Sequence, residues 1–498
     1  MNGRLERRTL LGGMIAGAAT IVVGYSREAR TWVPLDRGHP GRFDHVPALN
    51  GELLTDPSTQ DAFGQDLGFA VFTTPRAVLK PASIDDVAKM VRFCRKRGIR
   101  IAARGQGHST NGQSQVDGGL VIDTSTLATI HEIGDGYVVV DAGSTWRSLL
   151  EATLLEGQTP PVLTGFIGLS IGGTLSMGGV SGMAYNVGVQ VEQVQELTVV
   201  TGRGDVKKCS PKANRALFDA VLAGIGQYGI IVRARLTLVR AQERAFDLTL
   251  RYDDPDQFLN DVRMLMMRGE FDMIWGGAMQ DENGWYYQLF TTNFYTPPDF
   301  PDVDFMLREL SFDPAATLEA DGTYFEYQTR VDGLIESLRS IDAFEGLMHP
   351  WFDVFLPASE FVDYVDSVLP SLEPDDVGNF GFVLFFPLFR STIHRPLFRL
   401  PDDEIVLLFD ILTSANFPGF DADYAERMRQ RNRDLYEAAK AAGATRYPIG
   451  SVDFTRDDWR EHYGRQWRRV LASKRAFDPD HILAPSVGIF PESRPGSR

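Results

Sequence analysis

The chain carries a loop whose residue types suit the binding of a phosphate-bearing ligand. Arg104-Gly105-Gln106-Gly107-His108-Ser109 directly follows the segment 98–103 (GIRIAA), which predicts a short buried strand. Two glycines within three residues let a backbone turn sharply and approach a ligand closely. Consecutive amides in such a loop form a concavity that suits a diphosphate. His108 is then held against the ligand, unless the loop is an ordinary surface turn with an incidental histidine.

Two further glycine-rich stretches strengthen the case for a large ligand. The run 169–182 is rich in glycine and hydroxyl residues, a composition that predicts neither a good helix nor a good strand. It suits the lining of a site for a polar, extended ligand, because it supplies amide and hydroxyl groups where bulky side chains do not fit. The third stretch, 224–229, leads into a predicted strand at 230–238. Each stretch alone could be a glycine-rich turn, but three such stretches in one region are harder to explain as turns without a common ligand.

The elements that position these stretches alternate between strand and helix from about residue 71 to 240. A helix is expected from its N-cap Ser83 to Arg97, with Gly98 ending it and Asp86 placed to complete a capping box. From about 241 to 410 the strands are rich in aromatic residues and helices lie between them, which predicts a separate α+β domain. The tail, at 422–442 and 457–477, is expected to be helical.

Composition limits the classes of partner and cofactor. The 498 residues are 43% hydrophobic and 23% charged, as in ordinary globular proteins. A net charge of −16 argues against nucleic acid and against anionic membrane surfaces. Two cysteines, Cys94 and Cys209, build no disulfide framework or cysteine cluster. The eight histidines show no metal-ligand spacing, so no metal is expected.

The first 30 residues have the pattern of an export signal. Arg7-Arg8 precedes two leucines and a moderately apolar run at 12–24, which is typical of the twin-arginine route. The alternative is a frayed basic terminus. The apolar run is too short to span a bilayer comfortably, and no other integral membrane segment is expected. The prediction is a periplasmic or extracellular protein, with cleaved and membrane-tethered forms both left open.

The motifs together resemble a known family. Their order, followed by His349-Pro350-Trp351 and by 474–485 (KRAFDPDHILAP), is similar to the FAD-linked oxidases of the vanillyl-alcohol oxidase (PCMH-type) superfamily, and most of all to cytokinin dehydrogenase. The resemblance implies an α+β fold with a two-part PCMH-type FAD-binding domain at 71–241. It further implies a substrate-binding domain at 242–455, built on an antiparallel sheet covered by helices. The segment 456–490 would return to the flavin domain.

The resemblance also implies roles for single residues. His108 matches the histidine that is bonded covalently to the flavin. Trp351 matches an aromatic residue that packs on the substrate, although an ordinary core tryptophan is the alternative. Glu336 matches, less closely, a carboxylate at the mouth of the active site. The positions implied to contact FAD are Ala103, Gly105, Gln106, Gly107, His108, Ser109, Gln113, Ser114, Gly165, Ser170, Thr174, Ser176 and Ile231.

The sequence departs from the family at the substrate end. The family has Trp-Thr-Asp-Tyr-Leu where this chain reads Leu163-Thr164-Gly165-Phe166-Ile167, so the proposed catalytic base is a glycine. Asp353 replaces a family asparagine, and Ser486-Val487 replaces a Gly-Gln pair. A glycine accepts no proton, which leaves Asp353 and Glu336 as candidate bases, unless both lie at the solvent rim.

Two functions follow. The first is an FAD-dependent oxidoreductase that removes a hydride from a carbon bearing an amine or alcohol in a small organic substrate. Its electron acceptor would be molecular oxygen or a quinone. The second is a flavoprotein that has lost this chemistry and binds or scavenges a ligand. The absent aspartate favours the second function, whereas the retained His108 favours the first.

Overall fold

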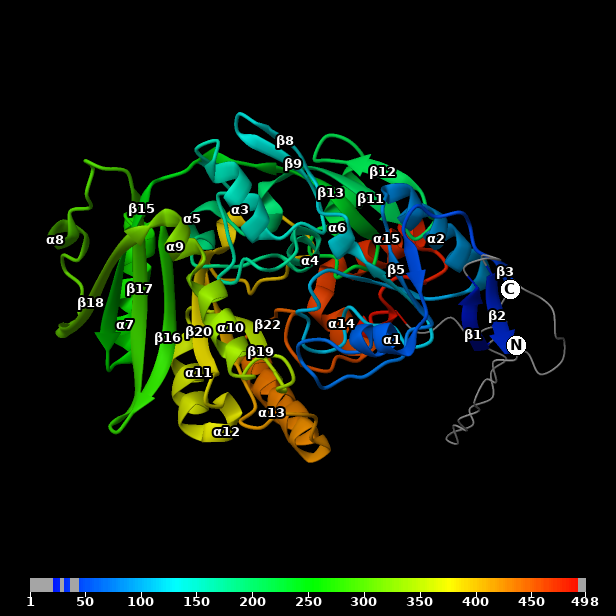
Figure 1. Ribbon diagram of the computed structural model, residues 1–498. Coiled ribbons are helices and arrows are strands. Elements are labelled where there is room, and N and C mark those ends of the chain that lie inside the picture. Colours follow the sequence, from blue (N-terminus) through cyan, green and yellow to red (C-terminus); the bar gives the residue numbers. More distant parts are fainter. Residues whose placement is uncertain (1–20, 27–30, 36–43, 491–498) are drawn as a thin grey trace.

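The computed structural model describes residues 21–26, 31–35 and 44–490 of the chain. The predicted export signal lies almost entirely outside these residues. Within the described ranges, no helix is both long and apolar enough to cross a membrane. Two bodies lie side by side, with the chain's early and late segments in one and its middle in the other (Figure 1).

The first body contains a four-stranded sheet that ends at the glycine loop. Its order is β4 (Glu52–Leu54), β5 (Ala77–Lys80), β7 (Leu120–Asp123) and β6 (Ile101–Arg104), with β5 and β6 parallel to β7. Helix α2 (Ile84–Arg97) buries Val87, Met90, Val91 and Cys94 in its core. Ser83 caps this helix and Gly98, at φ +64°, ends it. Asp86 completes no capping box; its carboxylate instead accepts from the Asn50, Gly51 and Ala82 amides.

A second sheet of five antiparallel strands completes this body. Its order is β12 (Val206–Cys209), β11 (Val194–Thr201), β13 (Gly229–Thr237), β9 (Tyr137–Asp141) and β8 (Ile130–Gly134). Helices α3 (Trp146–Leu154), α4 (Ile171–Met177) and α6 (Arg215–Val221) pack with it. The expectation that 169–182 forms no helix is wrong for α4. Ile171 and Leu175 anchor α4 in the core, and Gly172 lets it approach Ala142.

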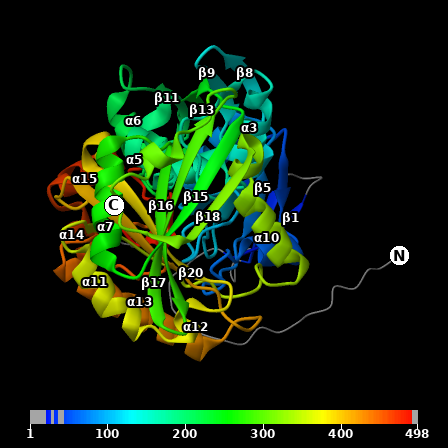
Figure 2. The ribbon, with the colours of Figure 1, turned by 90° about the vertical axis from the view of Figure 1, so that its left-hand side faces the viewer.

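The second body is built on one antiparallel sheet of eight strands. Their order is β18 (Asp313–Thr323), β15 (Arg244–Tyr252), β17 (Gly284–Tyr295), β16 (Met273–Asp281), β20 (Phe382–Phe389), β21 (Ile405–Leu412), β19 (Phe352–Pro357) and β22 (Thr445–Arg446). Helices α7 (Pro255–Arg268), α11 (Phe361–Val368) and α13 (Ala422–Ala441) cover one face (Figure 2). The other face packs toward the first body, with which it shares a hydrophobic core. The α+β architecture with two domains is as predicted.

The remaining strands form two small sheets, β1-β2-β3 and β10-β14, and the remaining helices connect the larger sheets. These strands and helices are β1 (Ile21–Ser26), β2 (Thr31–Leu35), β3 (Asp44–His45), α1 (Pro57–Phe63), β10 (Gln158–Thr159), α5 (Ala184–Val187), β14 (Val239–Arg240), α8 (Val303–Met306), α9 (Tyr324–Gln328), α10 (Arg330–Ser340), α12 (Pro374–Val377), α14 (Arg456–Tyr463) and α15 (Trp467–Phe477).

After α15 the chain returns to the first body. Leu483 forms a parallel bridge with Ile101 of β6, and the Ala484 amide donates to the Ile101 carbonyl at 2.9 Å. The buried Lys474 ammonium holds this turn by donating to the carbonyls of Gln227 (3.0 Å) and Leu483 (3.2 Å) and to Asp478 (2.9 Å). The end of the chain therefore lies against the strand that carries the His108 loop.

Candidate active site

A cavity of about 620 Å³ lies between the two bodies. One side, here called the loop wall, consists of residues from 101–124, 164–180, 225–231 and 483–484. The opposite side, the sheet wall, consists of side chains from β16, β20 and β21. Helix α10 and single residues of the connecting segments complete the lining: Ala343, Phe344, His349, Trp351, Phe380, Ser414, Tyr447 and Ile449. All thirteen residues that the sequence implied for cofactor contact lie on the loop wall.

The His108 loop is held by backbone geometry and by one buried carboxylate. Gly107 has φ +71°, a conformation that favours glycine. Its carbonyl accepts from the Leu67 amide at 3.0 Å. Asp66 accepts from the Ser109 hydroxyl at 2.9 Å and from the Gly112 amide at 2.7 Å. Asp66 thereby fixes both ends of the turn that presents His108.

Asp66 is not among the site residues predicted from the sequence. It lies before the predicted domain start at residue 71, and no glycine motif contains it. Burial raises the pKa of Asp66 to about 6, while its bonds to Ser109 and Gly112 oppose that rise. The only signal in the sequence is a single carboxylate between Gln65 and the apolar Leu67.

The imidazole of His108 lies in an aromatic pocket at the cavity wall. Its ring centroid is 5.2 Å from that of Phe166, 5.4 Å from Trp351 and 6.1 Å from Phe344. Burial, with His349 and Arg339 nearby, lowers the pKa of His108 to about 3. His108 is therefore neutral across the physiological pH range and keeps a nitrogen lone pair available as a nucleophile.

The start of helix α4 supplies the second part of the loop wall. Ser170 is its N-cap, but the Ser170 side chain makes no capping hydrogen bond. Ser170, Gly172 and Gly173 all line the cavity. A Cβ at Gly105 would stand 1.9 Å from the Ser170 hydroxyl oxygen, so the two segments meet this closely only because residue 105 is glycine. The His108 loop and the first residues of α4 together form a polar surface that carries no bulky side chains.

The sheet wall is apolar apart from one carboxylate. Phe382, Leu384 and Phe386 of β20 and Leu408 and Leu412 of β21 face the cavity. Between the last two lies Asp410, which also lines the cavity and is 3% exposed. It is the only carboxylate among the described residues of the lining. Its signal in the sequence is one acidic residue inside the apolar strand 405–412.

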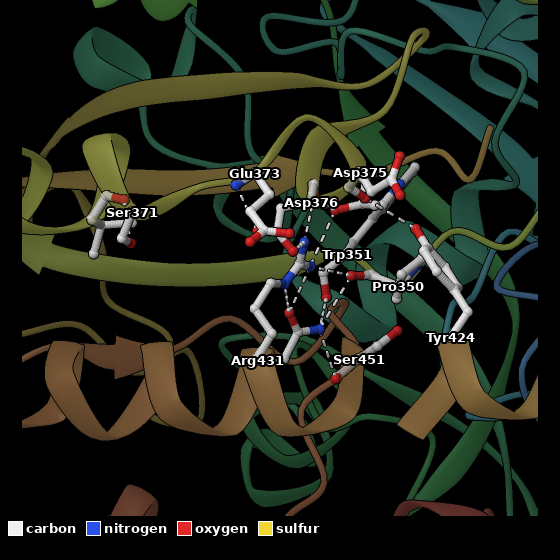
Figure 3. A network of polar contacts seen from close by, with 12 residues as sticks. Pro350, Trp351, Ser371, Glu373, Asp375, Asp376, Tyr424, Arg431 and Ser451 are labelled. Carbon is white, nitrogen blue, oxygen red and sulfur yellow. Dashed lines mark hydrogen bonds and ion pairs between the residues drawn. The ribbon is translucent and has the colours of Figure 1, made fainter. Parts of the chain in front are cut away.

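Trp351 lies at the edge of the sheet wall and is positioned from α13. The Asn432 amide nitrogen donates to the carbonyls of Pro350 (3.1 Å), Trp351 (3.1 Å) and Ser451 (3.0 Å). Arg431 donates to the Pro350 carbonyl at 3.0 Å and forms an ion pair with Asp376 (3.6 Å; Figure 3). Trp351 is thus a cavity residue rather than a core tryptophan, held beside His108 through its backbone.

The two candidate bases lie away from the cavity surface. Glu336 projects from the outer side of α10, where it is exposed and forms an ion pair with Arg147 (3.2 Å). Asp353 on β19 is fully buried and lies beside Asp410, its register partner on the neighbouring strand β21. Neither carboxylate is part of the lining: α10 turns its Leu334, Ile335 and Leu338 face inward, and β19 lies one strand beyond β21 in the sheet, on the side away from β16 and β20. Direct proton abstraction by either one is therefore not supported by this geometry.

Gly165 lines the cavity on the loop wall beside Phe166. A Cβ added there would meet nothing closer than Val331 at 4.0 Å. Space for a side chain therefore exists where the resemblance places a base. No group of three His, Cys, Asp or Glu residues in the described part of the chain is arranged to hold a metal ion.

Comparison with known proteins identifies the two bodies. Residues 75–210 match the model of an FAD-binding domain, and residues 250–490 match the model "Cytokinin dehydrogenase 1, FAD and cytokinin binding". The uncharacterized oxidoreductase ORF5 in the fasciation locus of Rhodococcoides fascians is 36% identical, over 88% of this chain and 98% of the relative.

Plant relatives match at similar length. Cytokinin dehydrogenase 3 of Oryza sativa subsp. japonica is 33% identical, over 92% of this chain and 94% of the relative. Cytokinin dehydrogenase 4 of Arabidopsis thaliana is 31% identical, over 89% and 93% respectively. Fold, cavity and relatives define an FAD-dependent oxidoreductase. Within that class, the chain belongs to the cytokinin dehydrogenase family.

The residues of the loop wall fit FAD. Cofactor sites commonly have roughly 300–1,000 Å³, which includes this cavity. The glycine-rich loop and the uncapped start of α4 offer amides that suit a diphosphate. The neutral His108 faces the same space as these amides.

Proposed function

We propose that this protein oxidises a C–H bond next to an amine or alcohol in a small organic substrate, using FAD attached covalently through His108. The observation that carries the proposal is the position of His108, neutral and enclosed by aromatic rings on a wall made of flavin-type loop residues. When bound, the flavin accepts the hydride that the substrate carbon loses.

The protein's own residues bind, orient and exclude water. Ser109, Ser170 and the glycines of the loop wall hold the cofactor through amides and hydroxyls. Trp351 and the leucines and phenylalanines of the sheet wall fix the substrate's apolar body and keep water out. The site contains no base at residue 165, which distinguishes this chain from the family pattern.

The substrate and the acceptor follow from the same proposal. The relatives are named cytokinin dehydrogenases, so isopentenyl-adenine, a cytokinin, is the natural probe amine. Its turnover should be slow, because Gly165 provides no acceptor for the amine proton at the position where the family pattern places one, and a general base contributes about 10²–10⁴-fold in rate. Molecular oxygen or a quinone then reoxidises the cofactor.

Export by the twin-arginine route is part of the proposal, because this route carries folded proteins that already hold their cofactor. The motivation is the pair Arg7-Arg8 before an apolar run. Replacing both arginines with lysine should trap the protein inside the cell, as measured by fractionation. Unchanged export would remove this part of the proposal.

The central test is the state of the flavin. After acid precipitation, the yellow colour should stay in the pellet of the unaltered protein and leave the pellet of His108→Ala. A panel of amines and alcohols should then contain a compound that bleaches the flavin absorbance without oxygen. Colour in the supernatant contradicts the covalent bond. Covalent flavin that no compound reduces favours a ligand-binding protein instead.

A further inference from the structure

Asp410 places a buried carboxyl group within the apolar sheet wall. It lines the cavity between Leu408 and Leu412, and its Oδ1 atom is buried without a hydrogen-bond partner in the described part of the chain. Burying a carboxyl group without a partner is costly, so such groups usually meet a ligand or carry a proton. The Asp410 carboxyl therefore needs a proton, or a hydrogen-bond donor, at a position that borders the cavity.

A second carboxyl lies beside the first, on the neighbouring strand. Asp353 of β19 is the register partner of Asp410 of β21, and neither of its side-chain oxygens has a donor among the described residues. Ionised carboxylates only accept hydrogen bonds. Contact between these two becomes a hydrogen bond only when one carries a proton, so the pair must share at least one proton to be stable.

The surroundings favour a shared proton. Burial raises the pKa of Asp353 to about 7, against the opposing effects of Asp410 and Arg446, and burial together with Asp353 raises the pKa of Asp410 well above its usual range. From β22, Arg446 donates to the Gly450 carbonyl at 2.9 Å and Tyr447 accepts from the Gly179 amide at 3.3 Å. The partner of Asp410 on β20 is Leu384, which is uncharged.

We propose that the pair Asp410 and Asp353 is the proton acceptor for substrate oxidation and replaces the base absent at Gly165. Asp410 is the catalytic residue that touches the substrate, and Asp353 is a positioning residue beside it on the neighbouring strand. The inference deepens the proposed function and depends on it. It places the reacting N–H or O–H group against β21, across the cavity from residue 165.

The substrate carbon loses its hydrogen with two electrons to the flavin, and a C=N or C=O double bond forms. The substrate N–H or O–H proton passes to Asp410, while the proton that Asp410 held passes to Asp353. The net charge of the pair changes from −1 to zero, and the extra proton leaves to solvent in the reoxidation half of the cycle.

The walls define the substrate class. The reacting group must be a neutral amine or alcohol with one hydrogen directed at Asp410, because the remainder of the sheet wall is apolar. The rest of the molecule must be an apolar or aromatic body that packs against Leu384, Leu412 and Trp351. A substrate with a second charged group has no partner on this wall.

The kinetic test measures anaerobic flavin reduction against pH, with a compound that reduces the unaltered protein. Asp410→Asn should slow reduction about a hundredfold and remove the pH dependence near neutrality. Asp353→Asn should slow it less and shift that dependence. Flavin content should stay unchanged in both. Asp402→Asn is the matched control, since Asp402 is 93% exposed and forms an ion pair with Arg390. Unaltered rates and pH profile in Asp410→Asn would overturn the relay.

A second measurement requires no variant. The infrared spectrum of the unaltered protein at pH 6 should show the C=O stretch of a buried, protonated carboxylic acid, and this band should shift when a compound from the panel binds. A spectrum without a protonated, ligand-sensitive carboxyl overturns the relay even where Asp410→Asn does not fold. Flavin that no amine or alcohol reduces contradicts the proposed function and the relay together. Reduction without this band contradicts only the relay.

The pH dependence of folding stability gives a third measurement, and the pKa shift of Asp353 fixes the direction of the expected change. The folded pKa of Asp353, about 7, lies above its ordinary value of 3.8, so the folded state retains a proton that the unfolded chain releases. Stability is then lost as pH rises between these two values. Asp353→Asn should raise Tm at pH 8 and leave it nearly unchanged at pH 4. A lower Tm at pH 8 contradicts the shared proton.

Discussion

The loop wall and the sheet wall enclose the same cavity but are encoded differently. The loop wall comes mainly from contiguous stretches, such as 103–109 and 170–176, in which almost every residue contributes. The sheet wall takes alternate residues from strands far apart in sequence, such as Leu384 of β20 and Leu408 of β21. Backbone groups dominate the first wall and side chains the second. The proposed cofactor contacts are therefore concentrated in short motifs, whereas the proposed substrate contacts depend on strand register.

The largest expected effect comes from adding bulk to the loop wall. In Gly105→Val the Cβ would stand 1.9 Å from the Ser170 hydroxyl oxygen and 2.8 Å from the Ser170 Cβ, so the loop must move away from α4. Cofactor affinity should fall about a hundredfold, since overpacking typically costs 1–3 kcal/mol and the two further methyls of valine place this change near the upper end of that range. The measurement is flavin absorbance per protein after purification.

Gly333→Ala is the control for this change, because a Cβ there meets nothing within 4 Å. Full flavin content in Gly105→Val would show that the loop wall tolerates bulk and that its glycines are not required for cofactor binding.

A substitution at residue 165 moves substrate chemistry onto the loop wall. Gly165→Asp places a carboxylate in free space, 4.0 Å or more from its nearest neighbour at the Cβ. Turnover of the probe amine should rise by about 10–100-fold, toward the lower end of what a general base contributes. Steady-state kinetics with Gly165→Asn as the matched control separates the effect of the base from that of bulk. An equal rise in both variants would show that shape, not proton transfer, limits the rate.

The smallest expected effect comes from loosening the sheet wall without touching the cavity. Asn432→Ala removes the amide that holds the carbonyls of Pro350, Trp351 and Ser451. The KM for a reducing substrate should rise about 5–20-fold, because unpaired buried groups cost roughly 1–2 kcal/mol here and Trp351 gains freedom. Flavin content should not change.

Gln430→Ala, on the exposed side of the same helix, is the control for this change. Loss of flavin in Asn432→Ala would contradict the separation of the two walls.

The order of strands and helices followed from local patterns, because periodicity and caps act over a few residues. Ser83 and Gly98 delimit α2 as expected. Helix α4 was not predictable from its glycines, because its stability comes from burying Ile171 and Leu175 against distant strands. Likewise, nothing in the neighbouring sequence distinguishes the buried Asp66 from an acidic residue on the surface, although Asp66 fixes the turn next to His108.

By itself, the sequence determined the cofactor end of this protein: the loop with His108, the hydroxyl-rich start of α4 and the family to which they belong. Such motifs can be recognised in a sequence because one short segment supplies the amides that contact the ligand. Tertiary structure alone decided the substrate end. Trp351 reaches the cavity, Glu336 stays on the outer side of α10, and Asp353 lies beside Asp410 but outside the cavity lining. The pairing of strands that are distant in the chain decides which face of each strand is turned toward the cavity. The same pairing decides which two carboxyl groups become neighbours.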